Sequence, residues 1–234
     1  MATRYEQKML FRRHHYTWNR FKGTWILLGP DGWRTTEQEA ERLIQQQRQQ
    51  PPPSPHEWAR AMIEQRALIL DTETTGLDPA TDEIIELASI ELDGTVIINT
   101  LVQSRKHVPA DATRVHGITN EMLAGKLTFP ELWDQLAPYL SRPLVIYNAA
   151  YDIPLLAYNA LSYGLRMARP QAHCLMTHYT DASVGPGGSY QKLENACRYY
   201  GIPVGNHRAL ADAQAARQVL TSLAEEVPAR ATIR

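Results

Sequence analysis

From Ala67 onward, short apolar runs alternate with stretches of helical periodicity, an arrangement that restricts the fold to a sheet covered by helices. The runs 67–70 and 144–147 are continuously apolar, as strands buried on both faces are. Strands at 84–92 and 95–102 flank an Asp-Gly pair, which predicts a hairpin with a type I′ turn. The sequence therefore predicts an α/β fold with a mixed five-stranded sheet, completed by an edge strand at 173–176 and by helices at 132–141, 153–161, 190–200 and 208–226.

The composition changes sharply at residues 45–55 (QQQRQQPPPSP), where apolar side chains vanish and polyproline geometry is favoured. We interpret 49–55 as a linker between a small α+β head, 1–48, and a main domain, 56–234. After the linker, Ser54, Pro55 and Glu57 have the pattern of a capping box and predict a short helix. Within the head, the predicted elements are strands at 16–20 and 24–28, a turn at 29–32 and a helix at 39–47.

The head is rich in basic and aromatic side chains. Its first 22 residues carry six cations against the single acid Glu6. In nucleic-acid-binding proteins, such cations bind phosphates and such aromatic side chains stack on bases. It also fits a small aromatic core with a solvated charged face, and the sequence leaves both interpretations open. The cations are Arg4, Lys8, Arg12, Arg13, Arg20 and Lys22, and the aromatic residues are Tyr5, Phe11, Tyr16, Trp18 and Phe21.

The overall composition excludes several classes of protein. The formal net charge of the 234 residues is -1, so contact with nucleic acid must come from local basic patches. Two cysteines, Cys174 and Cys197, are too few for a disulfide framework and do not have the spacing of a zinc site. No apolar run approaches the ~18 residues of a membrane span, and the charged N-terminus does not resemble a secretion signal. We expect a soluble, cytoplasmic protein without membrane contact.

Two acidic residues follow the first buried strand. Asp71 and Glu73 lie at i and i+2, so both side chains leave the same face of the strand end. The strand then ends in a turn at Gly76. Two acids at the end of an apolar strand have no evident structural role, which favours a functional one. An Asp-x-Glu pattern is common by chance, and its interpretation therefore depends on the acids found elsewhere.

Two further acids occupy comparable places. Asp152 follows the second buried strand at the entry to a helix, where it fits either a cap or the same acidic site. Asp212 shares the apolar stripe of the last helix with Ala215, Ala216 and Val219, unlike a solvated surface acid. Adjacent carboxylates at about 4 Å would repel by roughly 4 kcal/mol at an effective dielectric near 20. Divalent cations relieve such repulsion; oxygen ligands suit Mg²⁺ or Mn²⁺, and two such ions indicate phosphodiester hydrolysis.

His207 is the candidate general base. It precedes Asp212 by five residues, which on a regular helix would direct the two side chains about 140° apart. We therefore place His207 in the loop before the last helix, where it can take a proton from the nucleophilic water. An imidazole, which titrates near neutral pH, suits that role, although an ordinary surface histidine is the alternative.

Three motifs, in this order, resemble those of the DEDDh exonucleases, a DnaQ-like family that includes the epsilon proofreading subunit of bacterial DNA polymerase III and exonuclease X. The motifs are LDTETTGLD at 70–78, YNAAYD at 147–152 and HRALADA at 207–213. The segments IIELASIEL at 84–92 and RVHGIT at 114–119 are also similar to family segments. The resemblance covers about residues 66–224 and implies a ribonuclease H-like fold.

The resemblance also implies roles for individual residues. His207 would be the general base, acting with four catalytic acids that hold two Mg²⁺ or Mn²⁺ ions. The implied metal ligands are Asp71, Glu73, Asp152 and Asp212. The residues implied to bind or support the terminal nucleotide are Thr72, Thr74, Leu77, His116 and Asn148.

Three residues depart from the family pattern. Tyr147 stands where members often have His, Tyr151 where Phe is usual, and Cys174 where an acid is common. None of these positions is an implied metal ligand. The departures therefore bear on substrate preference rather than on the reaction.

We predict a metal-dependent 3′–5′ exonuclease that releases nucleoside monophosphates from DNA, in preference to RNA, by a two-metal-ion mechanism. The alternative is a non-catalytic or weakly catalytic accessory subunit that binds a polymerase or nucleic acid through its head. The expected partners are thus a DNA or RNA 3′ end and, through residues 1–50, a polymerase or another replication or repair protein.

Overall fold

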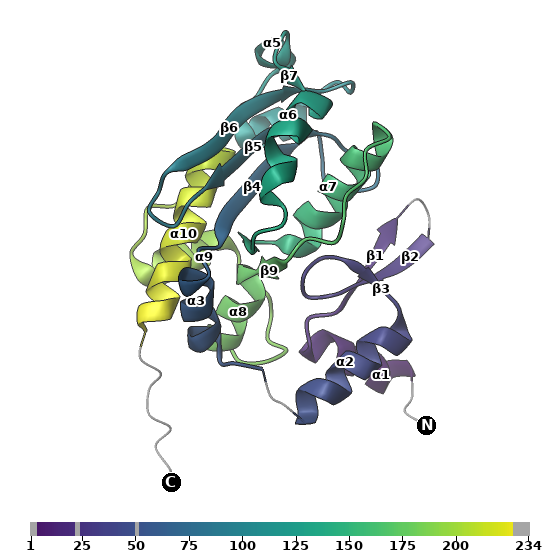
Figure 1. Cartoon of the computed structure of the whole chain (residues 1–234), viewed down its shortest axis with the longest axis vertical. Helices are drawn as coiled ribbons and strands as arrows, with labels where there is room; N and C mark the ends of the chain where they lie inside the picture. Colours follow the sequence, from purple (N-terminus) through teal and green to yellow (C-terminus); the bar gives the residue numbers. More distant parts are fainter. Residues whose placement is uncertain (1–3, 22–23, 50–51, 227–234) are drawn as a thin grey trace.

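The computed structural model describes residues 4–21, 24–49 and 52–226. Its main element is a six-stranded sheet in the order β7-β6-β5-β4-β8-β9 (Figure 1). β5 runs antiparallel to β4 and β6, and the remaining neighbours are parallel, so the sheet is mixed as predicted. The strands are β4 Leu68–Thr74, β5 Ile84–Ile90, β6 Val96–Gln103, β7 Leu127–Thr128, β8 Leu144–Ile146 and β9 Ala172–Cys174.

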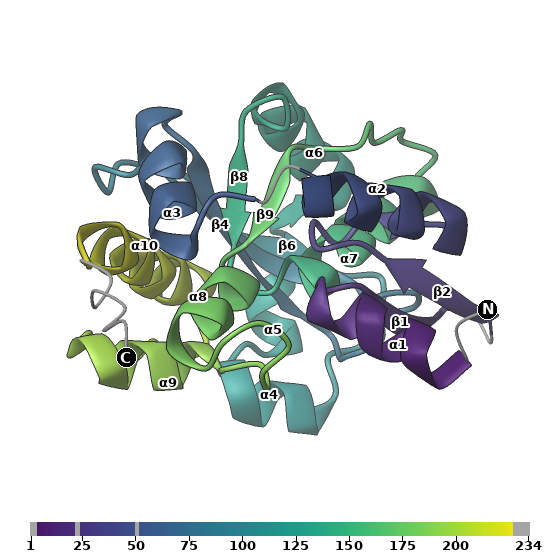
Figure 2. The same cartoon turned by 90° about the horizontal axis from the view of Figure 1, so that it is seen from below.

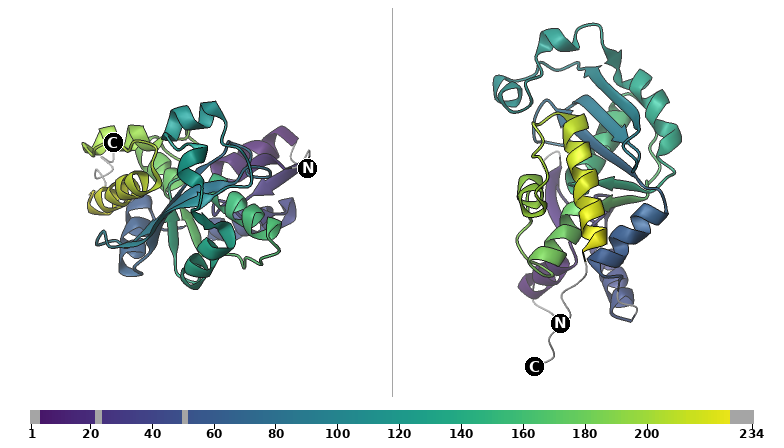
Figure 3. Two further views of the ribbon diagram at one scale, coloured as in Figure 1. Left: turned by 90° about the horizontal axis from the view of Figure 1, so that it is seen from above. Right: turned by 90° about the vertical axis from the view of Figure 1, so that its left-hand side faces the viewer.

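Helices cover both faces of this sheet (Figures 1 and 3). The alternation of β4 explains the two cores, because Ile69 packs in one and Leu70 in the other. The first core includes Val219 of α10, whose alanines Ala213 and Ala216 are buried against the sheet. The helices of the first core are α3 Pro55–Glu64, α8 Leu175–Ser183, α9 Leu193–Tyr200 and α10 Ala209–Glu225, and those of the second are α6 Phe129–Leu136 and α7 Ala149–Ser162.

The sheet has one strand more than the five predicted. β7 contains only two residues, too few for an alternating pattern to reveal a strand. The edge strand predicted to reach Met176 ends at Cys174, and the residues after it form α8, which was not predicted. The short helices α4 (Ala110–His116) and α5 (Asn120–Leu123) were also missed, because one or two turns show no helical period.

The type I′ turn predicted between β5 and β6 is wrong. Such a turn needs positive φ at both central residues, but only Gly94 of the pair has it, at 93°. The Gly94 N–H donates to the Glu91 carbonyl (3.0 Å), and the Glu91 N–H donates to the Thr95 carbonyl (2.8 Å). The loop is therefore one residue longer than predicted, with glycine at its left-handed position.

Helix boundaries also differ from the prediction, and α7 begins at Ala149 rather than at 153. α6 begins at Phe129, after a capping box formed by Thr128 and Glu131, and a 3₁₀ turn follows it from Ala137 to Tyr139. α9 begins at Leu193 rather than at 190 and ends at Gly201, as predicted. α3 has the predicted capping box at Ser54.

The head is a three-stranded antiparallel sheet with two helices (Figure 2). The strands and the second helix were predicted, whereas the first helix was not, because its charged sequence shows no clear apolar stripe. The second helix extends to Gln49, two residues beyond its predicted end and into the first residue of the predicted linker. The elements are α1 Arg4–Arg13, β1 Thr17–Phe21, β2 Thr24–Leu28, β3 Arg34–Thr35 and α2 Glu37–Gln49, and the core residues are Phe11, Tyr16, Leu27, Ala40 and Ile44.

Several sequence predictions fall outside the described residues or side chains: those for Arg4, Tyr5, Glu6, Phe21, Lys22, Gln50 and Pro51. Within the described ranges, none of the helices has the length and apolarity needed to cross a membrane.

Candidate active site

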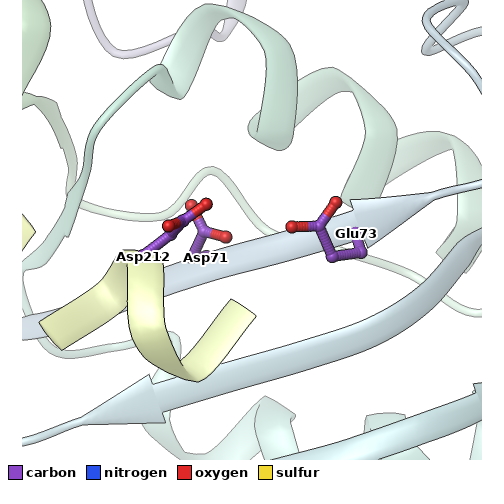
Figure 4. A group of neighbouring side chains, drawn as sticks. All are labelled: Asp71, Glu73 and Asp212. Atoms are coloured by element: carbon purple, nitrogen blue, oxygen red, sulfur yellow. The ribbon is translucent and has the colours of Figure 1, made fainter. Parts of the chain in front are cut away.

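Three carboxylates meet where β4 passes the first turns of α10. Asp71 and Glu73 come from β4 and Asp212 from α10, and each offers an oxygen within 4.8 Å of the others (Figure 4). The i and i+2 spacing and the apolar stripe on α10 thus bring these acids together, as predicted. All the donors are carboxylate oxygens, a set that suits a hard divalent cation.

Asp152, the fourth predicted acid, is buried in the first turn of α7. It lies outside the group of three, and its Oδ1 accepts a hydrogen bond from the Thr72 hydroxyl (2.7 Å). Its charge nevertheless raises the pKa of both Asp71 and Glu73, so the four acids form one electrostatic cluster.

Burial and mutual repulsion disfavour ionisation of these acids. Burial raises the pKa of Asp71 well above its ordinary value, and the charges of Asp152, Asp212 and Glu73 raise it further. Burial, followed by the charges of Asp212 and Glu86, raises the pKa of Glu73 to about 8. The pKa of Asp152 is raised by burial, although the hydrogen bond from the Thr72 hydroxyl lowers it. The charge of Arg208 lowers the pKa of Glu73 only in part, and a bound cation would offset the remaining repulsion.

His207 lies in the loop immediately before α10, with an exposed side chain and a φ of 55°. Burial raises the pKa of Asp212, whereas the charge of His207 and a hydrogen bond from its backbone N–H lower it. His207 and Asp212 are therefore close neighbours that interact electrostatically. The same loop passes close to the acid: a Cβ at Gly205 would overlap the Asp212 Oδ1. Only glycine fits at that position without displacing the carboxylate.

The residues predicted to bind the terminal nucleotide separate into two groups. Leu77 and Asn148 line a cavity of about 790 Å³, and the Leu77 side chain is 89% exposed. Thr72 and Thr74 are buried and do not line that cavity. His116 is likewise buried at the end of α4, where its Nδ1 accepts the Ile118 N–H (3.0 Å).

Sequence analysis missed one ion pair that supports the site. Glu86 on β5 is buried, and its Oε1 lies 2.5 Å from Nη2 of Arg208, which precedes α10. Glu86 Oε2 also accepts the Ala209 N–H (2.9 Å). An acid in the middle of the apolar strand IIELASI was the available signal, but its partner is 122 residues away.

A second missed contact fixes the turn after β4. The Tyr151 hydroxyl donates to the Gly76 carbonyl (2.5 Å) and lies 2.8 Å from the Thr74 hydroxyl. The usual Phe at this position could form neither bond, because it has no hydroxyl group. Tyr151 therefore ties α7 to the strand end that carries Asp71 and Glu73.

Comparison with known proteins identifies the family. Residues 68–220 match the family model described as "Exonuclease". The chain is 34% identical over 180 residues to the uncharacterized exonuclease CP81 of Escherichia phage 186, covering 71% of this chain and 92% of the relative. It is 32% identical over 177 residues to the DNA polymerase III subunit epsilon of Treponema pallidum (strain Nichols), covering 72% of this chain and 81% of the relative.

The chain belongs to the DnaQ-like, DEDDh-type exonucleases. It is accordingly a 3′–5′ exonuclease, as its sequence predicted, and the accessory-subunit alternative is not favoured. The fold agrees: the nuclease domain of 3′hExo, described as a DEDDh family member bound to rAMP, aligns with a TM-score of 0.58. That alignment covers 71% of this chain and 95% of the other at 16% identity, so it supports the ribonuclease H-like fold alone.

Proposed function

We propose that this exonuclease hydrolyses the terminal phosphodiester bond at the 3′ end of DNA and releases nucleoside monophosphates. Asp71, Glu73, Asp152 and Asp212 hold two divalent cations, Mg²⁺ or Mn²⁺, in this proposal. The observation that carries it is the convergence of carboxylate oxygens from β4 and α10 within 4.8 Å.

The donor set fits such ions. Hard, oxygen-rich sites favour Mg²⁺ and Mn²⁺, and the raised pKa of Glu73 shows that the buried cluster resists further negative charge. Two bound cations would stabilise the charge on the attacking and leaving oxygens of the phosphoryl transfer. Asp152 completes the set once its carboxylate turns from the Thr72 hydroxyl toward Asp71.

The remaining roles belong to residues around the acids. His207 accepts the proton of the attacking water on an imidazole nitrogen. Its side chain is exposed to solvent, and His207 lies close enough to Asp212 to lower the pKa of that acid. Leu77 and Asn148 bind the terminal nucleotide on the wall of the 790 Å³ cavity. Thr72, Thr74 and His116 position the end of β4 through buried hydrogen bonds.

DNA is the proposed substrate because of the relatives. The epsilon relatives are named as subunits of DNA polymerase III, and several similar folds were determined with DNA, including exonuclease X with a 5′ overhanging duplex. A polymerase partner follows from the same names.

The decisive test is release of mononucleotides from DNA and RNA oligomers of one sequence labelled at the 5′ end. With Mg²⁺ the ladder should shorten from the 3′ end, and it should be absent with chelator or in Asp212→Asn. Asp134→Asn, which changes an exposed acid on α6, is the matched control and should retain full activity. Wild-type rates from Asp212→Asn would refute the site, and faster cleavage of RNA would refute the substrate.

A further inference from the structure

The head is held against the main domain at defined points. A Cβ at Gly32, which has a φ of 75°, would overlap the Ala149 carbonyl oxygen at the start of α7. Arg169 contacts Asp31 Oδ2 through Nε (2.8 Å) and Nη2 (2.6 Å). On the other side, His15 Nε2 lies 2.8 Å from Asp181 Oδ2 of α8. These contacts fix the head beside α7 and α8 (Figure 2).

The cavity that contains Leu77 and Asn148 has one wall from each part of the chain. The main domain contributes these two residues together with Tyr151, and the head contributes Asn19 and Arg20 of β1. β1 is an edge strand of the head sheet. The proposed pocket for the terminal nucleotide therefore opens directly onto the head.

A second cavity of about 610 Å³ continues along the head. It shares Thr17 and Tyr190 with the first, so the two cavities adjoin. Its other lining residues are aromatic and polar, with one acid, Glu37, which accepts a hydrogen bond from Gln7 (3.4 Å). They include Lys8, Phe11, Arg12, Tyr16, Trp18 and Trp25. Together, the two cavities make a groove that begins at Leu77 and Asn148 of the main domain and runs across the head.

Cationic and aromatic side chains of this groove are available to a ligand. Arg20 and Trp25 are opposite partners in the β1–β2 ladder, so their side chains leave the same face. Trp25 is 63% exposed and Tyr190 is 38% exposed. Within the described ranges, Arg20 and Arg12 are exposed and neither forms an ion pair with a carboxylate.

We propose that the head forms a binding site for the single-stranded nucleic acid that precedes the terminal nucleotide. The proposal rests on the exonuclease function and extends its substrate site. Arg20 and Arg12 contact phosphates, and Trp25 and Tyr190 stack on bases. A single strand fits because stacking on an exposed indole requires an unpaired base, and a groove of cations with interleaved aromatics binds strands in this way.

Two substrates separate this site from the reaction itself. The dinucleotide TpT reaches only the acids and the terminal pocket, whereas a single-stranded oligothymidylate of about 12 nucleotides also spans the head. Trp25→Ala, which changes a residue of the second cavity alone, should lower kcat/KM for the oligomer by about 10- to 100-fold and leave the dinucleotide unchanged. Arg20→Ala should lower kcat/KM for the oligomer more than for the dinucleotide. Trp25→Phe should retain the wild-type value, because it keeps an aromatic face.

Binding of the same labelled oligomer in chelator provides an independent readout. Arg20→Ala should reduce the slope of log K against log salt by about 0.7 for one lost phosphate contact. Arg34→Ala removes an equal charge from an exposed position of β3 outside the groove and should bind as wild type does.

The outcomes are distinguishable. Unchanged oligomer cleavage and binding in both groove variants would overturn the proposal, as would an equal loss in Arg34→Ala. A wild-type protein that cleaves neither substrate would refute the exonuclease function, while the binding comparison would still decide whether the head holds the strand.

Discussion

Arg208 and Glu86 join the start of α10 to the strand beside the active site, with Nη2 2.5 Å from Oε1. Glu86 is the ladder partner of Glu73 on β4, and its second oxygen accepts the Ala209 N–H. The helix that carries Asp212 is therefore anchored to the strand next to the one that carries Asp71. Glu86 acts as a positioning residue, since it shapes the acidic cluster without belonging to the group of three.

Glu86→Gln should destabilise the protein by about 1–3 kcal/mol, because the neutral amide leaves Arg208 without its charged partner. The melting temperature should fall by roughly 2–12 °C for a chain of this size. We expect kcat to fall with little change in KM, since the acids are displaced while the nucleotide pocket remains. Glu39→Gln, which breaks the exposed pair with Arg42, should leave the melting temperature close to the wild-type value. Equal melting temperatures for the two variants would contradict this role.

His207→Ala should reduce kcat by about 10² to 10⁴-fold, the usual range for loss of a general base. Metal binding should persist, because the carboxylates remain in place, and Mn²⁺ titration followed by calorimetry can measure it. His107→Ala, in the loop after β6, is the matched control and should retain wild-type activity. A His207→Ala protein that no longer binds Mn²⁺ would indicate a ligand rather than a base.

The sequence predicted those parts of the site that depend on local patterns. The i and i+2 spacing of Asp71 and Glu73 requires only a strand, and the placement of Asp212 requires only a helix with an apolar stripe. The hydrogen bond that turns Asp152 toward Thr72 joins residues 80 positions apart, and no local pattern reports a side-chain rotamer. The Glu86–Arg208 ion pair could not be predicted for the same reason, since each partner alone is an ordinary charged residue.

The fold was predicted to a similar extent as the site. The apolar runs and the hairpin pattern predicted β4, β5, β6 and β8, although β4 continues past the predicted end at Leu70 through both acids to Thr74. β7 and the short helices depend on tertiary contacts. The position of the head was also beyond sequence analysis. It is set by the fit of Gly32 against Ala149 and by the ion pair between Asp31 and Arg169, which join residues more than 100 positions apart.

Glu73 should contribute less to the stability of the metal-free protein as the pH rises from about 4.5 to 8. Glu73 has a pKa of about 8 when folded, against an ordinary value of 4.5, so the folded state holds more protons across this window. Unfolding then releases protons, and a higher pH favours it. Thermal melts in chelator at pH 6 and pH 8 should compare the wild type with Glu73→Gln, because the lowered pKa values of His116, His173 and His178 act in the opposite direction in both proteins. Raising the pH should cost the wild type more stability than Glu73→Gln; an identical change in the two proteins would exclude the raised pKa.

Gly205→Ala should impair the site although residue 205 provides no side chain for catalysis. The new Cβ would overlap the Asp212 Oδ1, so either the carboxylate or the loop that carries His207 must move. Because misplacement by about 1 Å can cost about 10²-fold in rate, we expect a loss of that order in kcat and weaker Mn²⁺ binding. Pro203→Ala, at an exposed position of the same loop, should leave both quantities unchanged. If Gly205→Ala binds Mn²⁺ and cleaves DNA as the wild type does, the loop does not hold Asp212 in place.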